Sequence, residues 1–336
     1  MTVWESGGRV LRWGIVGTGR MAATMTNELR ALAAHGVEVL AVQSRDADRA
    51  RRFASTHAIP RAYGSIDALA RDADVDAVYI ATPPAAHAGQ AVTCLEHGKA
   101  VLCEKPFALN AAEASAMVAA AQSRRVFLME ALWTRFLPAV LALKRSLAEG
   151  RLGALQLLIA GGAFVPAAGP ANYLFDPVLG GGALLDAGVY LLSLASLFLG
   201  LPTAVLSSAE IGPTGVDEND ALLCEHPDGA KSLLYVSLRA RRTPDLELLG
   251  SRGRARLGAP IFRPTELTLV EGTATPETRT YPLAGSGYGY QLLAMIEALR
   301  RGETECSLIP LAESVAILQT MDDCRRQWRR GRRAEA

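Results

Sequence analysis

Three side chains have types that can hold charge or move a proton, and each stands where such a group is unusual. Asp186 and Tyr190 are four residues apart, so a helix places both on one face. The stretch around them, Ala183 to Leu199, is strongly apolar, and a carboxylate there needs a polar partner. Lys105 precedes Pro106, which fixes the backbone and disfavours helix at the lysine. An ammonium at that point could hydrogen-bond a substrate oxygen and lower the pKa of a neighbouring acid.

The same residues also have structural interpretations. A tyrosine in an apolar helix is often a core aromatic whose hydroxyl finds one partner. An isolated lysine is more often a surface residue than a functional one. The sequence pattern alone leaves both interpretations open.

The turn Gly17-Thr18-Gly19-Arg20-Met21-Ala22 lies between an apolar run and a helical pattern, where a dinucleotide-binding fingerprint stands. Gly17 permits the tight turn, Gly19 lets the backbone approach a pyrophosphate, and Ala22 lets the helix pack closely on the sheet. The N–H groups at the helix start would then face the phosphates. Glycine turns of this form also arise by chance, but this strand–turn–helix setting predicts a bound dinucleotide.

The residues at the end of the second apolar run predict which dinucleotide binds. NAD-binding sites usually have a carboxylate there for the ribose 2′-hydroxyl, whereas this chain has Ser44 and Arg45. A hydroxyl and a guanidinium suit a 2′-phosphate, so we predict NADP. Asp46 follows, and we interpret it as the N-cap of the next helix. The alternative is that Arg45 is an ordinary surface residue.

These residues must be positioned by the elements around them. From Leu11 to about Glu130, short apolar runs alternate with helical patterns, which indicates βαβ units and a parallel sheet. We therefore predict the α/β class, with a doubly wound Rossmann domain over residues 1–130. The expected strands are 13–16, 37–42, 77–81 and 101–103, and the expected helices include 22–34, 47–55 and 87–96.

After residue 130 the pattern changes to strands that follow one another without helices between them. Pro227-Asp228-Gly229 is typical of a hairpin turn, with glycine free to take positive φ. We predict an α+β domain over residues 131–336 with a mainly antiparallel sheet. Its expected strands are 155–164, 204–211, 221–225, 231–238, 246–250 and 266–270, and its expected helices are 138–149, 183–199, 288–300 and 311–330.

Composition narrows the class of protein. The formal net charge of +1 gives no overall field toward nucleic acid or anionic membrane, and we interpret the basic run 325–333 as a solvated helix end. The five cysteines form no C-x-x-C pair, so we expect neither disulfides nor a metal site. The first ten residues lack the apolar core of a signal peptide, and 183–199 is short for a membrane span. We expect a cytoplasmic protein.

Four segments together resemble the glucose–fructose oxidoreductase/inositol dehydrogenase (Gfo/Idh/MocA) family. They are Ala81-Thr82-Pro83-Pro84 with His87, Cys103-Glu104-Lys105-Pro106, Met129 to Phe136 and Gly181 to Tyr190. The resemblance runs from Leu11 to Trp328 and is nearest the dihydrodiol dehydrogenase and xylose dehydrogenase branch. It implies an oxidoreductase whose C-terminal sheet commonly uses its open face to form a homodimer.

The resemblance also implies roles for residues of this chain. Lys105, Asp186 and Tyr190 would share one catalytic site, in which Tyr190 moves the hydroxyl proton, Lys105 stabilises charge on oxygen and Asp186 orients the pair. The substrate would be a secondary alcohol or carbonyl of a sugar, cyclic polyol or trans-dihydrodiol, with Trp133, Arg135, Phe164 and Tyr173 as pocket residues or, for the first three, as interdomain packing. The cofactor contacts would be Gly17, Thr18, Gly19, Arg20, Met21, Ser44, Arg45, Thr82, Pro83, His87, Glu104 and Lys105, with a structural role as the alternative for His87 and Glu104.

The chain departs from the family pattern at three positions. Val165 and Tyr173 stand where arginine is common, and Gln291 stands where glutamate is usual. A less cationic pocket puts a sugar substrate in doubt. Two other functions stay open: a reductase of sugar-ketone or cyclic imine intermediates, and a non-catalytic NADP-binding sensor of the same fold.

Overall fold

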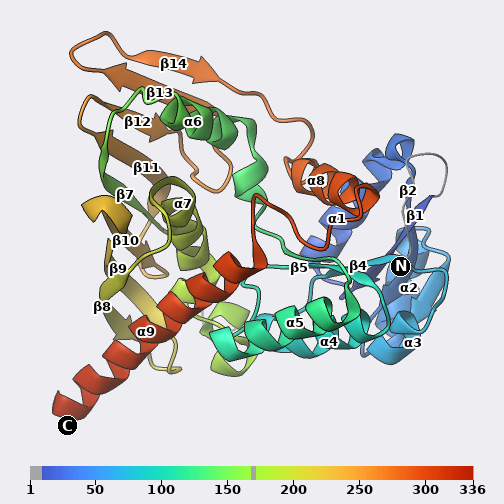
Figure 1. Cartoon of the computed structure of the whole chain (residues 1–336). Coiled ribbons are helices and arrows are strands. Elements are labelled where there is room, and N and C mark those ends of the chain that lie inside the picture. The colour runs from blue at the N-terminus through green and yellow to red at the C-terminus, as the bar shows by residue number, and fades with distance from the viewer. Residues whose placement is uncertain (1–9, 168–171, 336) are drawn as a thin grey trace. The chain divides into compact units, whose positions relative to one another are not determined.

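The computed structural model describes residues 10–167 and 172–335 (Figure 1). The chain forms two compact units, of which the first comprises Met1–Ala131 and Ala284–Val315 and the second comprises Leu132–Leu283 and Ala316–Ala336. The first ten residues, which we expect to hold no signal peptide, lie outside the described residues except for Val10. The chain passes from the first unit to the second after Ala131 and returns to the first over residues 284–315.

The first unit is built on a six-stranded parallel sheet, as predicted for a Rossmann domain. The strand order β3-β2-β1-β4-β5-β6 reverses between β1 and β4, which is the switch point where such sheets bind ligands. Its strands are β1 (Leu11–Val16), β2 (Val37–Gln43), β3 (Arg61–Tyr63), β4 (Ala77–Ile80), β5 (Ala100–Cys103) and β6 (Leu128–Glu130).

The central strands β1 and β4 are apolar apart from Arg12 of β1, because helices cover both faces of such a sheet. Ile15 of β1 lies beside Val42 of β2 and Tyr79 of β4, and all three are fully buried. The helices of this unit are α1 (Arg20–Ala31), α2 (Ala47–Thr56), α3 (Ile66–Ala70), α4 (His87–Glu96), α5 (Ala111–Arg124) and α8 (Gly289–Arg300).

The segment 284–315 is fastened to the first unit by polar contacts. Ser286 Oγ donates to Glu28 Oε1 of α1 at 2.7 Å, and Leu128 N of β6 donates to Thr304 O at 3.0 Å. Farther along, Ser314 Oγ donates to Glu130 Oε2 at 2.6 Å. These bonds join residues more than a hundred positions apart, so local sequence patterns do not reveal them.

The second unit is an α+β arrangement around an eight-stranded, mainly antiparallel sheet, as predicted. The order is β14-β13-β12-β11-β7-β10-β9-β8, and only the central pair β7–β10 is parallel among its described strands. The strands are β7 (Leu155–Ala163), β8 (Ala204–Ile211), β9 (Asp217–Glu225), β10 (Lys231–Ser237), β11 (Arg242–Gly250), β12 (Gly253–Leu257), β13 (Glu266–Glu271) and β14 (Glu277–Thr280).

One face of this sheet is covered by α6 (Pro138–Ala148) and α7 (Val189–Leu199), which lie in front of the strands in Figure 1. Side chains alternate along each strand, so residues in register on neighbouring strands share a face. The row under the helices is apolar and buried: Leu222, Leu234, Ala160, Leu246, Leu257 and Leu267. The core of the second unit lies along this row.

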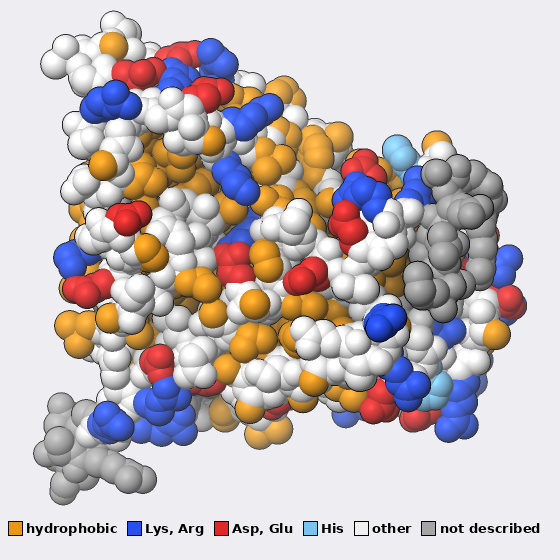
Figure 2. All heavy atoms as spheres, viewed as in Figure 1, with side chains coloured by type: hydrophobic (Ala, Val, Ile, Leu, Met, Phe, Trp, Pro, Cys, Tyr) orange, Lys and Arg blue, Asp and Glu red, His pale blue; other side chains and the backbone are white. Residues whose placement is uncertain are grey.

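The last helix, α9 (Leu311–Glu335), begins in the first unit and continues into the second. Its basic end carries ion pairs from Arg325 to Asp322 and from Arg326 to Asp323, and Figure 2 shows positive side chains there at the surface. The pairing agrees with a solvated helix end; the side chains of 331–336 are not described.

One helical stretch in the described residues, Pro177–Leu199, is long and apolar enough to pass a test for a membrane span. Most of that window is buried within the protein, as expected of the interior helix of a folded domain. All five cysteines are buried with free thiols.

Candidate active site

The glycine turn at the carboxyl end of β1 requires glycine at one position and leaves space at another. Gly17 has φ +102°, and a Cβ there would lie 2.6 Å from the carbonyl oxygen of Ala81, which follows β4. A Cβ on Gly19 would meet no described atom within 4 Å. The backbone is therefore tight against β4 at Gly17 and open at Gly19, and Thr18 lies between them.

The turn leads into a helix whose first N–H groups have no capping side chain among the described residues. Gly19 is the N-cap of α1, and no acidic residue stands in its first turn. Arg20 is exposed and Met21 is half-buried at this end. By contrast, α2 and α5 are capped by Asp46 and Asn110. An open backbone beside an uncapped helix start fits the pyrophosphate of a dinucleotide.

The edge of β2 presents the residues expected to decide between NAD and NADP. Ser44 is half-buried, its backbone N–H bonded to Tyr63 O at 3.1 Å, and Arg45 is exposed. Asp46 Oδ1 accepts from the N–H groups of Asp48 and Arg49 at 2.9 and 3.0 Å, which lowers its pKa and confirms the predicted N-cap. The Asp46 carboxylate next to the strand end thus accepts hydrogen bonds from the backbone N–H groups at the start of α2.

His87 ties together the loops after β4 and β5. Its Nδ1 lies 2.9 Å from Pro106 O and its Nε2 lies 2.9 Å from Thr82 O, while Thr82 Oγ1 donates to Gln90 at 2.6 Å. The ring is buried, and burial lowers the His87 pKa more than the two carbonyls raise it. His87 therefore holds Thr82 and Pro83 close to the segment that carries Lys105.

The Lys105 segment is fixed by two buried glutamates. Tyr79 donates to Glu104 Oε1, and Glu104 Oε2 accepts from the Lys105 N–H at 3.1 Å. On the other side, Glu130 Oε1 accepts from Phe107 N at 3.1 Å. Both carboxylates accept from backbone N–H groups, and the half-buried Lys105 lies at the same sheet edge as the glycine turn.

In the second unit, Asp186 lies in a π-helical turn, Leu184–Gly188, that precedes α7. The sequence predicted one regular helix from 183 to 199, so the wider first turn is a local departure, of a kind frequent at functional sites. Tyr173 donates its hydroxyl to Asp186 Oδ1 at 3.1 Å. The tyrosine that replaces a family arginine therefore contacts the predicted catalytic carboxylate.

Tyr190 lies in the first turn of α7 and has aromatic neighbours. Trp133 Nε1 donates to Tyr190 Oη at 3.1 Å, and the Phe262 ring lies 6.4 Å from the Tyr190 ring, centroid to centroid. Thr134 next to the tryptophan donates to Phe262 O at 2.9 Å. The second unit thus brings together Trp133 and Tyr190, and separately Tyr173 and Asp186.

Two other predicted pocket residues lie differently. Arg135 is fully buried and donates to Ser193, through Nε to Oγ at 2.7 Å and through Nη2 to the carbonyl oxygen at 2.6 Å. It holds the Trp133 segment on α7 one turn beyond Tyr190. Phe164 and Val165 follow β7 with exposed side chains, and the Phe164 N–H donates to Ser237 O at 2.9 Å.

Sequence reasoning missed the residues that support these groups. Tyr79, Glu130 and Ser314 give no local signal because each looks like an ordinary member of its element. Gln291, which stands where the family usually has glutamate, is buried, and its side-chain amide has no partner among the described residues. The acid-rich start of β9, Asp217-Glu218-Asn219-Asp220, was the one available signal, since acids are costly on a buried strand.

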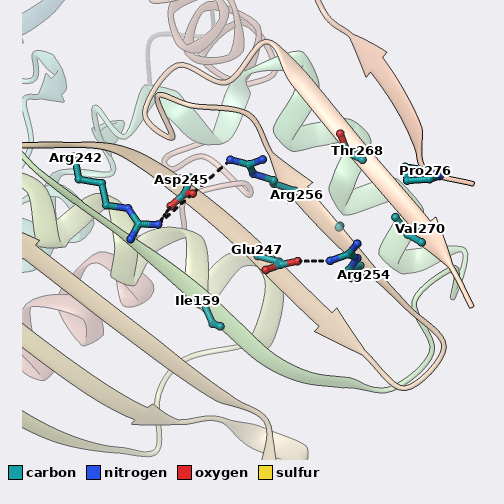
Figure 3. A pocket seen from close by; sticks show the side chains of 10 residues that line it. Ile159, Arg242, Asp245, Glu247, Arg254, Arg256, Thr268, Val270 and Pro276 are labelled. Carbon is teal, nitrogen blue, oxygen red and sulfur yellow. Dashed lines mark hydrogen bonds and ion pairs between the residues drawn. The ribbon is translucent and has the colours of Figure 1, made fainter. Parts of the chain in front are cut away.

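A hollow of about 420 Å³ lies on the sheet face opposite α6 and α7, away from the residues described above. Figure 3 shows the guanidinium groups of Arg242 and Arg256 on either side of Asp245, and Arg254 beside Glu247. These pairs are exposed and so contribute little to stability. The hollow is a feature of the open sheet face.

Comparison with known proteins agrees with this architecture. Residues 11–132 match the oxidoreductase family with an NAD-binding Rossmann fold, and residues 140–256 match the GFO/IDH/MocA C-terminal domain. The chain is 38% identical over 329 residues to a trans-1,2-dihydrobenzene-1,2-diol dehydrogenase of Bos taurus, covering 94% of this chain and 96% of that protein. The corresponding Homo sapiens enzyme is 37% identical with the same coverage.

A solved structure is similar along nearly its whole length. A 3-ketoreductase from Actinomadura kijaniata, in complex with NADP and TDP-benzene, superposes with a TM-score of 0.85 at 27% identity, covering 94% of this chain and 97% of that one. Both halves of the chain match, and the relatives align from end to end. This protein therefore belongs to the Gfo/Idh/MocA family of oxidoreductases.

Proposed function

We propose that this oxidoreductase is an NADP-dependent dehydrogenase of secondary alcohols, with trans-dihydrodiols as its first substrate class and sugars or cyclic polyols as its second. The end-to-end relatives at 37–38% identity are named for a trans-dihydrodiol. Val165 and Tyr173, in place of the arginines common in the family, leave fewer cations for a polyhydroxylated or phosphorylated ligand. Both points favour the less polar diol.

In the proposed site, Lys105, Asp186 and Tyr190 act on one hydroxyl group. Tyr190 takes the hydroxyl proton, Lys105 stabilises the negative charge that develops on the substrate oxygen, and Asp186 orients the two. Trp133 donates to the Tyr190 oxygen and so stabilises the negative charge that this oxygen must carry before it takes the proton. A bound nicotinamide would supply the hydride acceptor for oxidation or the hydride donor for reduction.

The preference for NADP rests on the edge of β2. Asp46 is occupied by the amides of α2, so it is poorly placed to accept from a ribose 2′-hydroxyl. Ser44 and the exposed Arg45 instead offer a hydroxyl and a planar cation to a 2′-phosphate. Gly17, Thr18, Gly19, Arg20 and Met21 would hold the pyrophosphate, with Thr82, Pro83, His87 and Glu104 shaping the nicotinamide end.

The observation that carries the proposal is that the first unit alone brings the open glycine turn and Lys105 to one edge of a parallel sheet, on either side of β4. The test is reduction of NADP⁺ and of NAD⁺ with trans-dihydrodiols, aldoses and cyclic polyols, followed by absorbance of the reduced nicotinamide. Tyr190→Phe serves as the matched inactive variant. Tight NADP binding with no turnover in either direction would instead identify a non-catalytic sensor.

A second candidate is a reductase of a sugar ketone or cyclic imine. It is favoured by the likeness to a 3-ketoreductase at 27% identity. Oxidation of NADPH with ketone and imine substrates, compared with oxidation of the matching alcohols, decides the direction.

We also infer a cytoplasmic homodimer that pairs through the open sheet face, with a small molecule as its other partner. One row of in-register side chains on that face is apolar across β8, β9, β10 and β7: Leu206, Leu223, Leu233 and Ile159. Leu206 is 67% exposed and Leu233 is 42% exposed. A contiguous exposed apolar row favours a protein partner.

A further inference from the structure

Two buried acids at the start of β9 lie on one face of the strand because of a bulge. Ile211 of β8 pairs with Asp217, but the preceding Glu210 pairs with Asn219, so Glu218 is an extra residue in β9. Without it, Asp217 and Asp220, three positions apart, would point to opposite faces. With it, both face the core row, where Asp220 lies beside Val236.

Asp217 is seated against the backbone that leads into α7. Gly182 has φ +116°, and a Cβ there would lie 2.4 Å from Asp217 Oδ1, so the carboxylate occupies the space that any other residue would need. Asp217 Oδ2 accepts from the Leu184 N–H at 2.7 Å. Leu184 opens the π-helical turn that carries Asp186 two residues later. A carboxylate at this helix start is also favoured by the dipole.

Asp220 is buried, and neither of its carboxyl oxygens has a donor among the described residues. An ionised carboxylate without donors is unstable in such a place, whereas a protonated one can donate to a neighbour. The neighbour is Asp217: burial first, and then the charge of Asp217 and a hydrogen bond with it, raise the pKa of Asp220 to about 10. One proton then serves two carboxyl groups.

Among the described residues, no cation counts among the causes that shift the pKa of Asp220. Cys324 on α9 lies near Asp220, and Cys224 lies farther along β9; burial is the main cause that raises the pKa of each thiol to about 11. Glu218, the bulged residue, pairs instead with Arg239, at 3.6 Å.

We propose that Asp217 and Asp220 form a proton-sharing pair of positioning residues that anchors the π-helical turn and thereby fixes Asp186 for catalysis. Asp220 donates to Asp217, and Asp217 holds the Leu184 N–H. The pair does not touch the reacting atoms. The part of this inference that concerns turnover rests on the proposed function, while the anchor itself can be tested without substrate.

The first experiment measures the proton and the anchor directly. Infrared spectra at neutral pH should show a protonated carboxyl band that Asp220→Asn removes and that the exposed hairpin control Asp228→Asn keeps. Hydrogen exchange of the peptide spanning 182–189 should be faster by roughly tenfold or more in Asp217→Ala, where Leu184 loses its acceptor, than in Asp217→Asn, which retains one. An unchanged infrared band in Asp220→Asn, or equal exchange in both Asp217 variants, overturns the proposal.

The second experiment separates positioning from general damage. Asp217→Ala should lower kcat about tenfold or more with the KM for NADP unchanged, since misplacement of a catalytic group affects the chemical step. Asp220→Leu, which cannot donate, should lower kcat, and Asp220→Asn, which can, should recover most of it. Equal kcat in Asp220→Leu and Asp220→Asn counts against the pair. If the wild type turns over no substrate, the proposed function fails while exchange and infrared still decide the anchor.

Discussion

The indole N–H of Trp133 donates a 3.1 Å hydrogen bond to the hydroxyl oxygen of Tyr190. The two residues are 57 positions apart, and they meet because Arg135 holds the Trp133 segment against Ser193 on α7. In the proposed mechanism this donor stabilises the Tyr190 oxygen that takes the hydroxyl proton of the substrate. The bond therefore yields the first prediction.

Tyr190→Phe should lower kcat by roughly 10²- to 10⁴-fold, the usual loss of a proton-transfer group. Trp133→Phe keeps an aromatic ring and removes one hydrogen bond, worth about 1 kcal/mol, so kcat should fall about fivefold. Steady-state kinetics with saturating NADP measures both. The control is Trp328→Phe, because the Trp328 N–H has no partner among the described residues. A Tyr190→Phe enzyme with wild-type turnover would reject Tyr190 as the proton carrier.

Tyr173→Phe removes only the hydroxyl that donates to Asp186 at 3.1 Å. Because this bond is exposed, we expect a modest fall in kcat, about two- to fivefold. Tyr281→Phe, in the loop after β14, is the matched control. Tyr173→Arg, which restores the residue common in the family, should favour sugar over dihydrodiol substrates in kcat/KM. Unchanged substrate preference in Tyr173→Arg would remove Tyr173 from the specificity argument.

Arg45→Ala should raise the KM for NADP by roughly 10- to 100-fold, since a hydrogen bond to a charged group contributes about 1.5–3 kcal/mol. The KM for NAD should change little, because NAD lacks the 2′-phosphate. Arg51→Ala is the control: that arginine is exposed on α2 and pairs with Asp48. Equal effects of Arg45→Ala on both cofactors would contradict the assignment.

His87 makes the loops around Lys105 sensitive to acid. Burial lowers its pKa in the folded protein, whereas the unfolded chain binds the proton near the ordinary pKa of about 6.5. The unfolded state therefore holds more protons as the pH falls below that value, and stability is lost by up to about 1.4 kcal/mol per pH unit. Above it, the contribution of the neutral ring is fully present.

The measurement is the thermal midpoint at about pH 7.5 and about pH 5.5. His87→Gln should narrow the difference between the two midpoints, while His97→Gln, an exposed helix-end control, should leave it unchanged. An identical pH response in His87→Gln and the wild type would show that protonation of another group governs acid stability.

Leu233→Glu should convert the proposed dimer into monomers, because it places a charge in the exposed apolar row of β10. Light scattering after size-exclusion chromatography measures the mass. Val178→Glu is the control, as Val178 is 77% exposed and lies outside the sheet. A dimer that survives Leu233→Glu must use another face.

Much of the fold is encoded in patterns that span one or two turns of chain. The alternation of apolar runs with helical stretches predicted the parallel sheet, and Pro227-Asp228-Gly229 predicted the β9–β10 hairpin, in which Asp228 and Gly229 both take positive φ. The missed elements have weak local signals. β3 and β6 are three residues long, and α5 has a mostly alanine face, although Asn110 bonded to Glu113 is a capping signal that could have marked it.

By itself, the sequence determined the two fold classes, the glycine turn, the N-cap at Asp46 and the candidate chemistry of Lys105, Asp186 and Tyr190. Only the tertiary structure decided the contacts between distant side chains: Trp133 donates to Tyr190, Tyr173 donates to Asp186, and Ser314 donates to Glu130. Strand and helix periods are set by nearby residues, so they can be inferred from spacing. Contacts between distant segments, and the bulge that joins Asp217 to Asp220, depend on how whole elements pack, and no local period encodes that.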